Sequence, residues 1–378
     1  MTVAASLLAL SLFTQADAGA GQAKAMQNAL RAVLHLAPAL SSKTAFTVAA
    51  GTPALKADLD ALMQVEHGFR TGGSTDPGAG SIAAVLSTQI AQARAQLSNG
   101  DVENARAQLR GLTTLCFACH TLSATVDLEM PFRTPSVALT SFERASLLAA
   151  TRHFDDAIAL WLIALRRAPK TIEESTDQLN ALRQALAVAV SVKDNPNTTL
   201  ELLDARAVGD LNGPYASGWT TAWRSATSAW ALERFDVRAK TAQQLFTRAK
   251  ALVEQSHAAE HILSDETHTI GLLRATAYLT HALTREPHAR WRSEALLALG
   301  VATATVRESM VWGLDAVYFE ACIRENPGTP IAQRCFSLLM ERTLFGFTGS
   351  SGTHLPRDVD DRLRNLAKLA GAAGSVRP

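Results

Sequence analysis

The stretch from Asp101 to His120, DVENARAQLRGLTTLCFACH, combines a helical pattern with the most direct cofactor motif of the chain. Its apolar residues recur at alternating steps of three and four, the spacing that places them on one face of an α-helix. Asp101 precedes the first of them and belongs to the residue types that favour a helix N-cap. The apolar positions are Val102, Ala105, Leu109, Leu112, Cys116 and Cys119. The stretch therefore predicts one amphipathic helix with both cysteines on its buried face.

The end of this stretch, Cys116-Phe117-Ala118-Cys119-His120, reads C-x-x-C-H, the attachment signature for c-type haem. Two thiols one helical turn apart can add to the two vinyl groups of a haem, and His120 is then held under the iron as its proximal ligand. A thioredoxin-like redox pair would need a βαβ context, which the helical pattern denies. A zinc site would need further ligands from the distant Cys322 and Cys335. We therefore expect one covalently attached haem c on Cys116 and Cys119.

The composition favours an all-α protein. Hydrophobic residues make up 47% of the 378 residues, only three are tyrosines, and stretches rich in β-branched residues are few. The length is enough for two or three domains with their own cores. The formal net charge is +1 and no run of Lys or Arg creates a local positive field, so we expect no nucleic-acid partner.

The N-terminal residues 1–18 are predicted to be a secretory signal peptide. Met1 to Phe13 are apolar over a length too short to span a bilayer, and Ala16-Asp17-Ala18 places small residues where a signal peptidase cleaves. Export agrees with the haem motif, because bacteria attach haem to C-x-x-C-H outside the cytoplasm. After cleavage, no segment has the length and apolarity of a transmembrane helix. We expect a periplasmic or otherwise exported protein; the alternative is a buried N-terminal helix of a cytosolic one.

The remaining two cysteines, Cys322 and Cys335, flank Asn326-Pro327-Gly328-Thr329-Pro330 at nearly equal distances from its centre. This turn should end one helix and begin the next, so a helical hairpin would bring the two cysteines side by side. A disulfide there would persist only in an oxidising compartment. The alternative is a pair of small buried thiols that fill a helix interface.

Residues 19–130 are predicted to form a haem-binding four-helix bundle. Four apolar periodicities run over residues 26–37, 55–63, 82–97 and 102–119, with a loop around 71–81. Four helices with short connections give an up-down-up-down bundle, whose core can hold a cofactor. A C-x-x-C-H motif near the end of the fourth helix of such a bundle resembles the cytochrome c-prime and c-556 group. The resemblance implies a fold and a haem, and it names no partner.

The topology of such a bundle narrows the choice of the sixth ligand to the iron. His120 lies near one end of the fourth helix, and antiparallel alternation brings the start of the first helix and the end of the second to the same level. Met26 in the first helix is the leading distal candidate, as in methionine-ligated members of the resembled group. His67 and Met63 near the end of the second helix are the alternatives, and an open or apolar distal face is the remaining one.

Residues 136–378 are predicted to form a tetratricopeptide-like helical repeat domain. Pro131 and Thr134-Pro135 mark a linker before it. The chain then resembles one tetratricopeptide repeat, with small, aromatic and proline residues at the positions of that motif. These residues are Ala145, Leu148, Phe154, Ala157, Trp161, Ala164 and Pro169. A degenerate copy follows at Ala295 to Gly300 and Phe319 to Pro327. Because one repeat cannot bury its own face, we expect a stacked helical array.

A competing metal motif lies further along the chain. His257-Ala258-Ala259-Glu260-His261 spells H-x-x-E-H, the pattern of inverted zinc peptidases. It ends a predicted amphipathic helix, and no third ligand is identifiable nearby. A solvated helix end with two imidazoles is the favoured interpretation.

Together these patterns predict an exported monohaem c-type cytochrome and no enzyme. One-electron transfer is the expected function, with the repeat domain docking a redox partner protein. Two alternatives remain: a haem-based gas or redox sensor with an open distal face, and a partner-binding scaffold whose haem is structural. A six-coordinate iron favours the first function, and a five-coordinate ferrous iron that binds CO favours the sensor.

Overall fold

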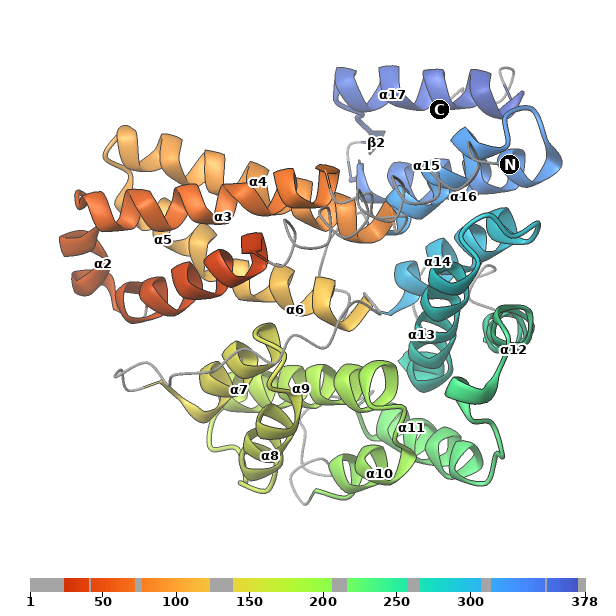
Figure 1. Ribbon diagram of the computed structural model, residues 1–378, viewed down its shortest axis with the longest axis horizontal. Coiled ribbons are helices and arrows are strands. Elements are labelled where there is room, and N and C mark those ends of the chain that lie inside the picture. The colour runs from red at the N-terminus through yellow and green to blue at the C-terminus, as the bar shows by residue number, and fades with distance from the viewer. Residues whose placement is uncertain are drawn as a thin grey trace, which may run out of the picture. The chain divides into compact units, whose positions relative to one another are not determined.

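The computed structural model describes residues 24–40, 42–71, 77–122, 139–205, 216–256, 266–306, 314–350 and 352–372. In these residues the chain is almost entirely helical, which confirms the predicted all-α class. The strands of the described part are the short pair β1 (Thr348–Gly349) and β2 (Gly352–Thr353), which form one antiparallel ribbon. The chain divides into two compact units, Met1–Ala164 and Leu165–Pro378 (Figure 1). The predicted signal peptide lies outside the described residues.

The first unit contains a helix over residues 24–40, followed by six helices and most of a seventh. These are α2 (Lys43–Ala49), α3 (Pro53–Thr71), α4 (Pro77–Ser98), α5 (Val102–Arg110), α6 (Leu112–Leu122), α7 (Ser141–Ala150) and α8 (Phe154–Leu165). Helix α3 packs on α4, α4 packs on both α5 and α6, and α6 packs on α7. Helix α7, which the sequence assigns to the predicted repeat domain, thus contacts the helix that carries C-x-x-C-H. The predicted linker at 131–135 lies outside the described residues, so the predicted boundary there stays a prediction.

The predicted helix from Asp101 begins where expected and is interrupted once. The carboxylate of Asp101 accepts from the backbone N–H of Asn104 at 3.3 Å, as an N-cap does. Gly111 ends α5, and α6 begins at the next residue. The expectation of one continuous helix is therefore wrong at this residue. Glycine is a weak helix former, and this outweighs the unbroken apolar periodicity.

The first helix also extends beyond its expected end. It continues two residues past Pro38, because a proline in the last turn removes only one backbone donor there. The short helix α2 follows it and was not expected. Arg94 on α4 forms a salt bridge with Asp60 on α3 at 2.6 Å, and Arg106 on α5 donates to the Leu40 carbonyl at 3.2 Å.

The second unit is a succession of helices, most of which pack on a neighbour along the chain. They are α9 (Ile172–Ala187) with the π-helical turn η1 (Val188–Val192), α10 (Pro196–Asp204), α11 (Ala216–Ala231), the 3-10 turn η3 (Val237–Ala239), α12 (Ala242–Gln255), the 3-10 turn η4 (Glu266–His268), α13 (Thr269–Arg285), α14 (Arg292–Thr305), α15 (Leu314–Glu325), α16 (Pro330–Gly346) and α17 (Arg357–Ala370). From α12 to α17 each helix packs on the next, and α12 with α14, α14 with α16, and α15 with α17 are also in contact.

A glycine allows the close approach of α14 and α15. A Cβ atom built at Gly300 would lie 2.4 Å from the ring of Phe319, which is itself buried. No larger residue fits without displacing that ring. The small residue Gly300 and the aromatic residue Phe319 therefore meet across the interface of α14 and α15.

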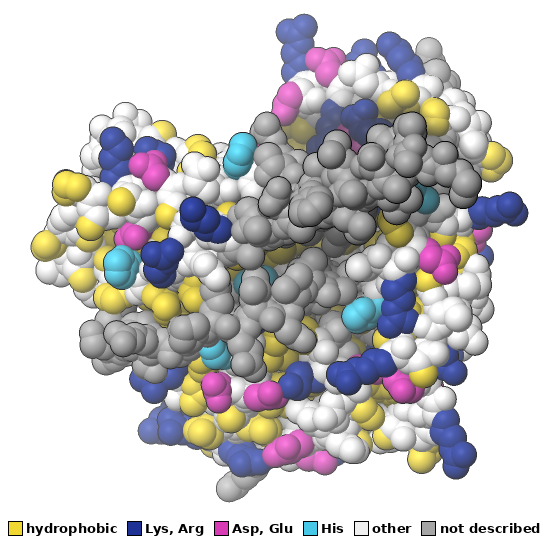
Figure 2. Space-filling model, viewed as in Figure 1, with side chains coloured by type: hydrophobic (Ala, Val, Ile, Leu, Met, Phe, Trp, Pro, Cys, Tyr) yellow, Lys and Arg dark blue, Asp and Glu magenta, His cyan; other side chains and the backbone are white. Residues whose placement is uncertain are grey.

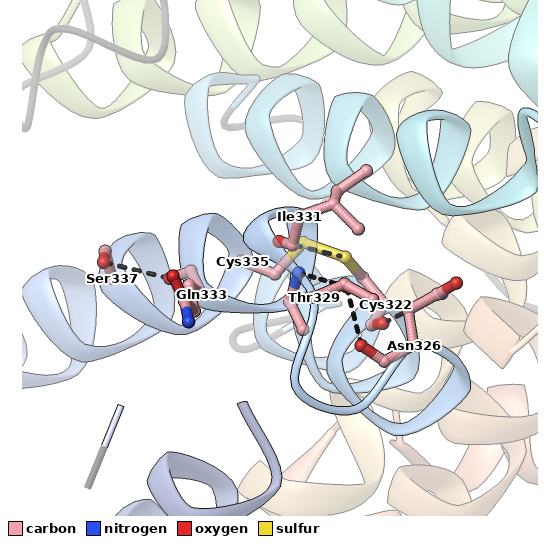
Figure 3. The surroundings of a disulfide bond; sticks show 8 residues. Cys322, Asn326, Thr329, Ile331, Gln333, Cys335 and Ser337 are labelled. Carbon is pink, nitrogen blue, oxygen red and sulfur yellow. Dashed lines mark hydrogen bonds between the residues drawn. A yellow bond between two sulfur atoms is a disulfide. The ribbon is translucent and has the colours of Figure 1, made fainter. Parts of the chain in front are cut away.

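The turn between α15 and α16 carries the disulfide that the cysteine spacing predicts. Cys322 and Cys335 are bonded, with their Cα atoms 6.4 Å apart (Figure 3). Gly328 adopts φ +74°, the left-handed conformation that glycine accepts without strain, and Thr329 caps α16 by accepting from the backbone N–H of Ala332. Both cysteines are fully buried. The predicted bond is confirmed.

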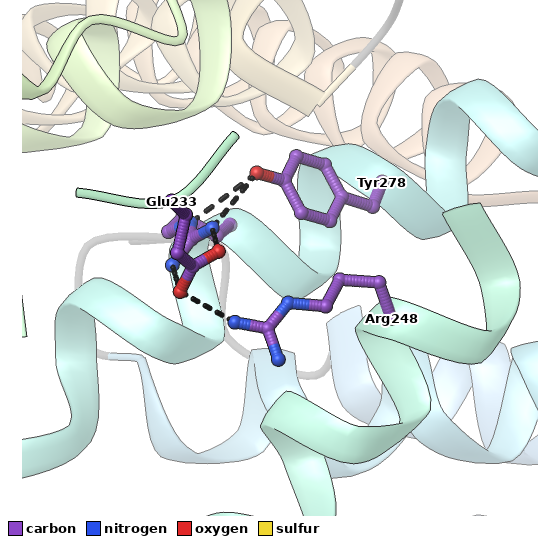
Figure 4. A network of polar contacts seen from close by, with 4 residues as sticks. Glu233, Arg248 and Tyr278 are labelled. Atoms are coloured by element: carbon purple, nitrogen blue, oxygen red, sulfur yellow. Dashed lines mark hydrogen bonds and ion pairs between the residues drawn. The ribbon is translucent and has the colours of Figure 1, made fainter. Parts of the chain in front are cut away.

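A buried ion-pair network joins α12 and α13 to the segment after α11. The guanidinium of Arg274, only 3% exposed, donates to the carboxylate of Glu233 at 2.7 Å and to the hydroxyl of Tyr278 at 3.2 Å. Arg248 approaches the same carboxylate at 2.5 Å (Figure 4). Arg274 also lies over the ring of Trp230, 4.8 Å from its centroid. Burial alone would raise the pKa of Glu233, but the hydrogen bonds and charges of the two arginines hold it below its usual value.

Candidate functional site

Helix α6 carries Cys116, Cys119 and His120 on one side. At 3.6 residues per turn, His120 lies about 40° from Cys116 around the helix axis and Cys119 about 60° from it in the other direction. Cys119 is buried, whereas Cys116 and His120 are half-buried. The helix therefore presents two thiols, one turn apart, beside an imidazole.

Both cysteines of α6 are reduced thiols. Neither takes part in a disulfide. Burial raises the pKa of the Cys116 thiol to about 11, and a backbone hydrogen bond opposes this only in part. Reactive thiols of exchange enzymes lie instead at helix N-termini, where the dipole favours the thiolate. Cys116 lies in the middle of α6 and Cys119 in its last turn, so neither has the helix N-terminal position that would support the thioredoxin-like alternative.

His120 is a neutral imidazole with an unused ring nitrogen. Burial, together with the positive charge of Arg152, lowers its pKa to about 4, and a hydrogen bond with the backbone of Ala150 works against this shift. Its Nδ1 atom is buried and has no hydrogen-bond partner among the described residues. A neutral imidazole is the form that binds a metal ion. A buried nitrogen without a partner is costly unless a ligand satisfies it.

Helices α7 and α8 pack against the flank of the motif. The ring of Phe117, between the two cysteines, meets the indole of Trp161 edge to face, with centroids 6.4 Å apart and planes at 89°. Trp161 on α8 is fully buried, and its Nε1 has no partner in the described part of the chain. The sequence assigned Trp161 to the repeat consensus alone and missed its contact with the haem motif.

The corner between α7 and α8 lies next to His120. The Thr151 hydroxyl donates to the carbonyl of Leu147 at 2.9 Å and lies 3.2 Å from Nδ1 of His153. Between these two residues Arg152 adopts φ +69°, a left-handed conformation that few residues other than glycine adopt. The sequence carries no signal for this conformation, because Thr151 to His153 simply interrupts a helical pattern.

The predicted distal ligands lie on the helix of residues 24–40 and on α3. Met26 and Met63 are half-buried and His67 is exposed. In Figure 1 the helix of residues 24–40 begins toward the same side of the first unit at which α3 and α6 end. The choice between Met26, His67, Met63 and an open face stays a prediction.

The competing metal motif at His257 to His261 lies outside the described residues. Within the described ranges, no three His, Cys, Asp or Glu side chains gather into a group that could hold a metal ion. A haem iron does not need such a group, because the porphyrin supplies four of its ligands and the protein only one or two. On the face drawn in Figure 2, basic and acidic side chains are interspersed over each unit.

Comparison with protein-family models, with curated proteins and with solved structures finds no match. Among the helices that the structure describes, none combines the length and the apolarity that a bilayer crossing requires.

Proposed function

We propose that this chain is an exported monohaem c-type cytochrome that transfers single electrons. One observation carries the proposal: α6 holds two reduced thiols one turn apart beside a neutral imidazole whose buried Nδ1 atom has no hydrogen-bond partner among the described residues. Cys116 and Cys119 are the thioether anchors and His120 is the proximal ligand. Met26 is the proposed distal ligand, with His67 and Met63 as the alternatives.

The residues of α6 fit a haem in three respects. Neither thiol is in a disulfide, both lie on the side of the helix that carries His120, and the imidazole is uncharged. Bound haem supplies an iron that alternates between the ferric and ferrous states. The chain holds that group at two thiols, keeps His120 neutral by burial, and packs Phe117 and Trp161 beside the attachment site so that water is excluded from that flank.

The proposed haem domain is a four-helix bundle of the cytochrome c-prime type. Its helices would be residues 24–40, α3, α4 and the pair α5 and α6, and the packing of α4 on α3, α5 and α6 supports this arrangement. The proposed tetratricopeptide-like array comprises the helices from α7 onward. The burial of Ala145, Ala157 and Trp161 at consensus positions, and the fit of Gly300 against Phe319, support it.

The array is proposed to dock a redox partner protein, because stacked helix pairs present extended surfaces of the kind that bind proteins. An oxidising location such as the periplasm is proposed for the chain. The disulfide between Cys322 and Cys335 supports this location, since such bonds are rare where glutathione and thioredoxin keep thiols reduced.

The test is covalent haem retention. The full chain is made with the c-type maturation machinery, exported, and stained for haem after denaturing electrophoresis. The stain should be present in the wild type and absent in Cys116→Ala/Cys119→Ala, because only thioether bonds survive denaturation. The matched control is Cys322→Ala/Cys335→Ala, which removes the same two residue types outside α6 and should keep its stain. Haem retained by the first double variant, or absent from the wild type, would overturn the proposal.

A further inference from the structure

The junction between α9 and α10 departs from regular helix geometry at two successive points. Helix α9 continues into the π-helical turn η1, whose first three residues are buried. Asp194 follows with φ +47°, a left-handed conformation that few residues other than glycine adopt. Asn195 then caps α10 by accepting from the backbone N–H of Thr198 at 3.1 Å. Short π-helical turns and left-handed residues concentrate at functional sites, and the proposed cytochrome function makes no use of this junction.

The side chain of Asp194 holds one carboxylate oxygen in the interior without a hydrogen-bond donor. Its Oδ1 atom is buried and has no partner among the described residues, although the residue as a whole is half-buried. Glu266, a buried carboxylate of the same unit, differs in this respect, because Arg183 donates to both of its oxygens, at 2.6 and 3.2 Å. A buried carboxylate oxygen without a donor favours the protonated, uncharged form of the group.

Two contacts fix the register between α9, with η1, and the segment of η4 and α13. Arg183 on α9 meets Glu266 in η4, 83 residues further along the chain. The Ser191 hydroxyl in η1 donates to the Leu273 carbonyl on α13, 82 residues further along. Because the two separations are nearly equal, the two segments run parallel. Direct packing of η1 on α13 agrees with this register.

The same register brings Asp194 close to the level of Thr276 on α13, between Arg274 and Tyr278. The guanidinium of Arg274 uses all three of its nitrogen atoms as donors to Glu233 and Tyr278. Figure 4 shows the Glu233 carboxylate and the Tyr278 hydroxyl in this network. The donors of the nearest guanidinium on α13 are therefore occupied, and Oδ1 of Asp194 is left without one.

Charged groups of both signs surround Asp194. Burial has the largest influence on its carboxyl group and raises its pKa to about 6, against the attraction of Arg274 and together with the repulsion of Asp236. The charges on α9 and α10 are paired with other residues, Arg183 with Glu266 and Glu201 with Arg166. The groups that face Asp194 are Arg274 and Tyr278 on α13, Asp236 and Arg238 after α11, and Lys193 in the turn itself.

We infer that Asp194 is a proton-binding site that makes the packing of the α9–α10 junction on α13 depend on pH. The uncharged carboxyl suits the buried position of Oδ1, so uptake of a proton stabilises the junction. At neutral pH the charged form remains in the interior, and the junction packs less firmly. The helical array of the second unit is therefore firmer in mildly acidic surroundings, whether or not α6 binds haem.

The direction of the effect follows from proton binding. The pKa of Asp194 in the folded chain lies above its ordinary value of 3.8. Between the two values the folded chain binds more protons than the unfolded chain, so stability rises as pH falls through about 6. At about pH 5, one unit below the folded pKa, the contribution of Asp194 should lower the unfolding constant about tenfold relative to about pH 7.5.

The experiment is denaturant unfolding of the full chain at these two pH values. Asp194→Asn keeps the shape of the side chain, tolerates the left-handed conformation and binds no proton in this range. The control is Asp177→Asn, which removes an exposed carboxylate from α9. For each chain the unfolding constant at about pH 7.5 is divided by that at about pH 5. The ratio should be about tenfold larger for the wild type and for Asp177→Asn than for Asp194→Asn, because the other carboxylates contribute equally to all three.

Equal ratios for the wild type and Asp194→Asn would overturn the inference. If Asp194→Asn does not fold, a carbon-13 NMR titration of the wild-type side-chain carboxyl decides instead. A midpoint near 6 would support the proton-binding site, whereas a midpoint near the ordinary value of 3.8 would refute it. The haem stain of the exported chain should be the same in all three proteins, so the outcome of this test and that of the proposed function are read separately.

Discussion

The chain contains two cysteine pairs with opposite chemistry. Cys322 and Cys335 lie on two helices that a glycine turn folds together, and they form a disulfide. Cys116 and Cys119 lie on one helix, one turn apart, and remain thiols. Both pairs consist of largely buried residues in helical surroundings. One pair thus joins two helices, whereas the other belongs to a single helix.

The comparison shows how a helix can keep two thiols available in a chain that also carries a disulfide. The cysteine of α15 and the cysteine of α16 face one another across a hairpin interface. The two α6 cysteines instead lie on the same side of a single helix. Burial also raises the pKa of Cys116, so its thiolate, the form that attacks a disulfide, is scarce at neutral pH. The α6 pair is thereby suited to attachment of a ligand that presents two reactive groups.

Among the tests of this difference between the two pairs, the largest expected effect is a loss of stability in the second unit when its disulfide is reduced. Reduction of the bond between Cys322 and Cys335 should lower the free energy of unfolding of this unit by about 3 kcal/mol, because the bond restricts a short loop of the unfolded chain. Thermal unfolding with and without reductant measures it. The haem spectrum should not change, since the bond lies in the unit that does not contain α6.

Two controls accompany this measurement. Cys322→Ala/Cys335→Ala should unfold identically with and without reductant. Alkylation of denatured, unreduced, haem-free chain should label two cysteines, and the haem-loaded chain should show none. Four labelled cysteines in the haem-free chain would mean that the bond does not form in the isolated protein.

The sequence predicts the disulfide of one pair better than it predicts the surroundings of the other. The disulfide was predictable because Asn326 to Pro330 contains strong turn signals, and a turn between helices determines which residues face one another. The arrangement within the C-x-x-C-H motif was also predictable, because its residues are neighbours on one helical turn. The surroundings of α6 were not predictable: Gly111 interrupts a helix whose apolar periodicity continues, and the backbone of Ala150 reaches His120 only through the packing of α7 on α6. Local patterns report on local structure, and the contacts of α7 with α6 join residues far apart in the chain.

The second expected effect is an alkaline loss of stability to which the thiol of Cys116 contributes. The thiol of Cys116 has a pKa near 11 when folded, above the ordinary value of 9.0. Between these values the folded chain binds more protons than the unfolded chain, so stability falls as pH rises from about 9 to 11. Two units of pKa correspond to about 2 to 3 kcal/mol in this window. Denaturant unfolding of the haem-free chain at pH 8.5 and 10.5 measures it.

The matched variant is Cys116→Ala in the same haem-free chain, which should lose less stability over this range. Haem-loaded protein should resemble the variant, because a thioether has no proton to release. Equal slopes for the wild type and Cys116→Ala would show that this thiol titrates normally and that burial does not suppress its reactivity.

The smallest expected effect on stability comes from substitution of Met26, the proposed distal ligand of the haem. Met26→Ala removes a half-buried side chain, so its cost to folding should be modest, yet it should abolish the weak charge-transfer band of a methionine-ligated ferric haem. The reduction potential should fall as well, because a thioether ligand favours the ferrous state. His67→Ala, an exposed position on α3, is the matched control and should leave both properties nearly unchanged. The reverse pattern would assign the distal role to His67. An unchanged spectrum in both variants, with CO binding by the ferrous wild type, would mean an open site and would favour the sensor over the electron carrier.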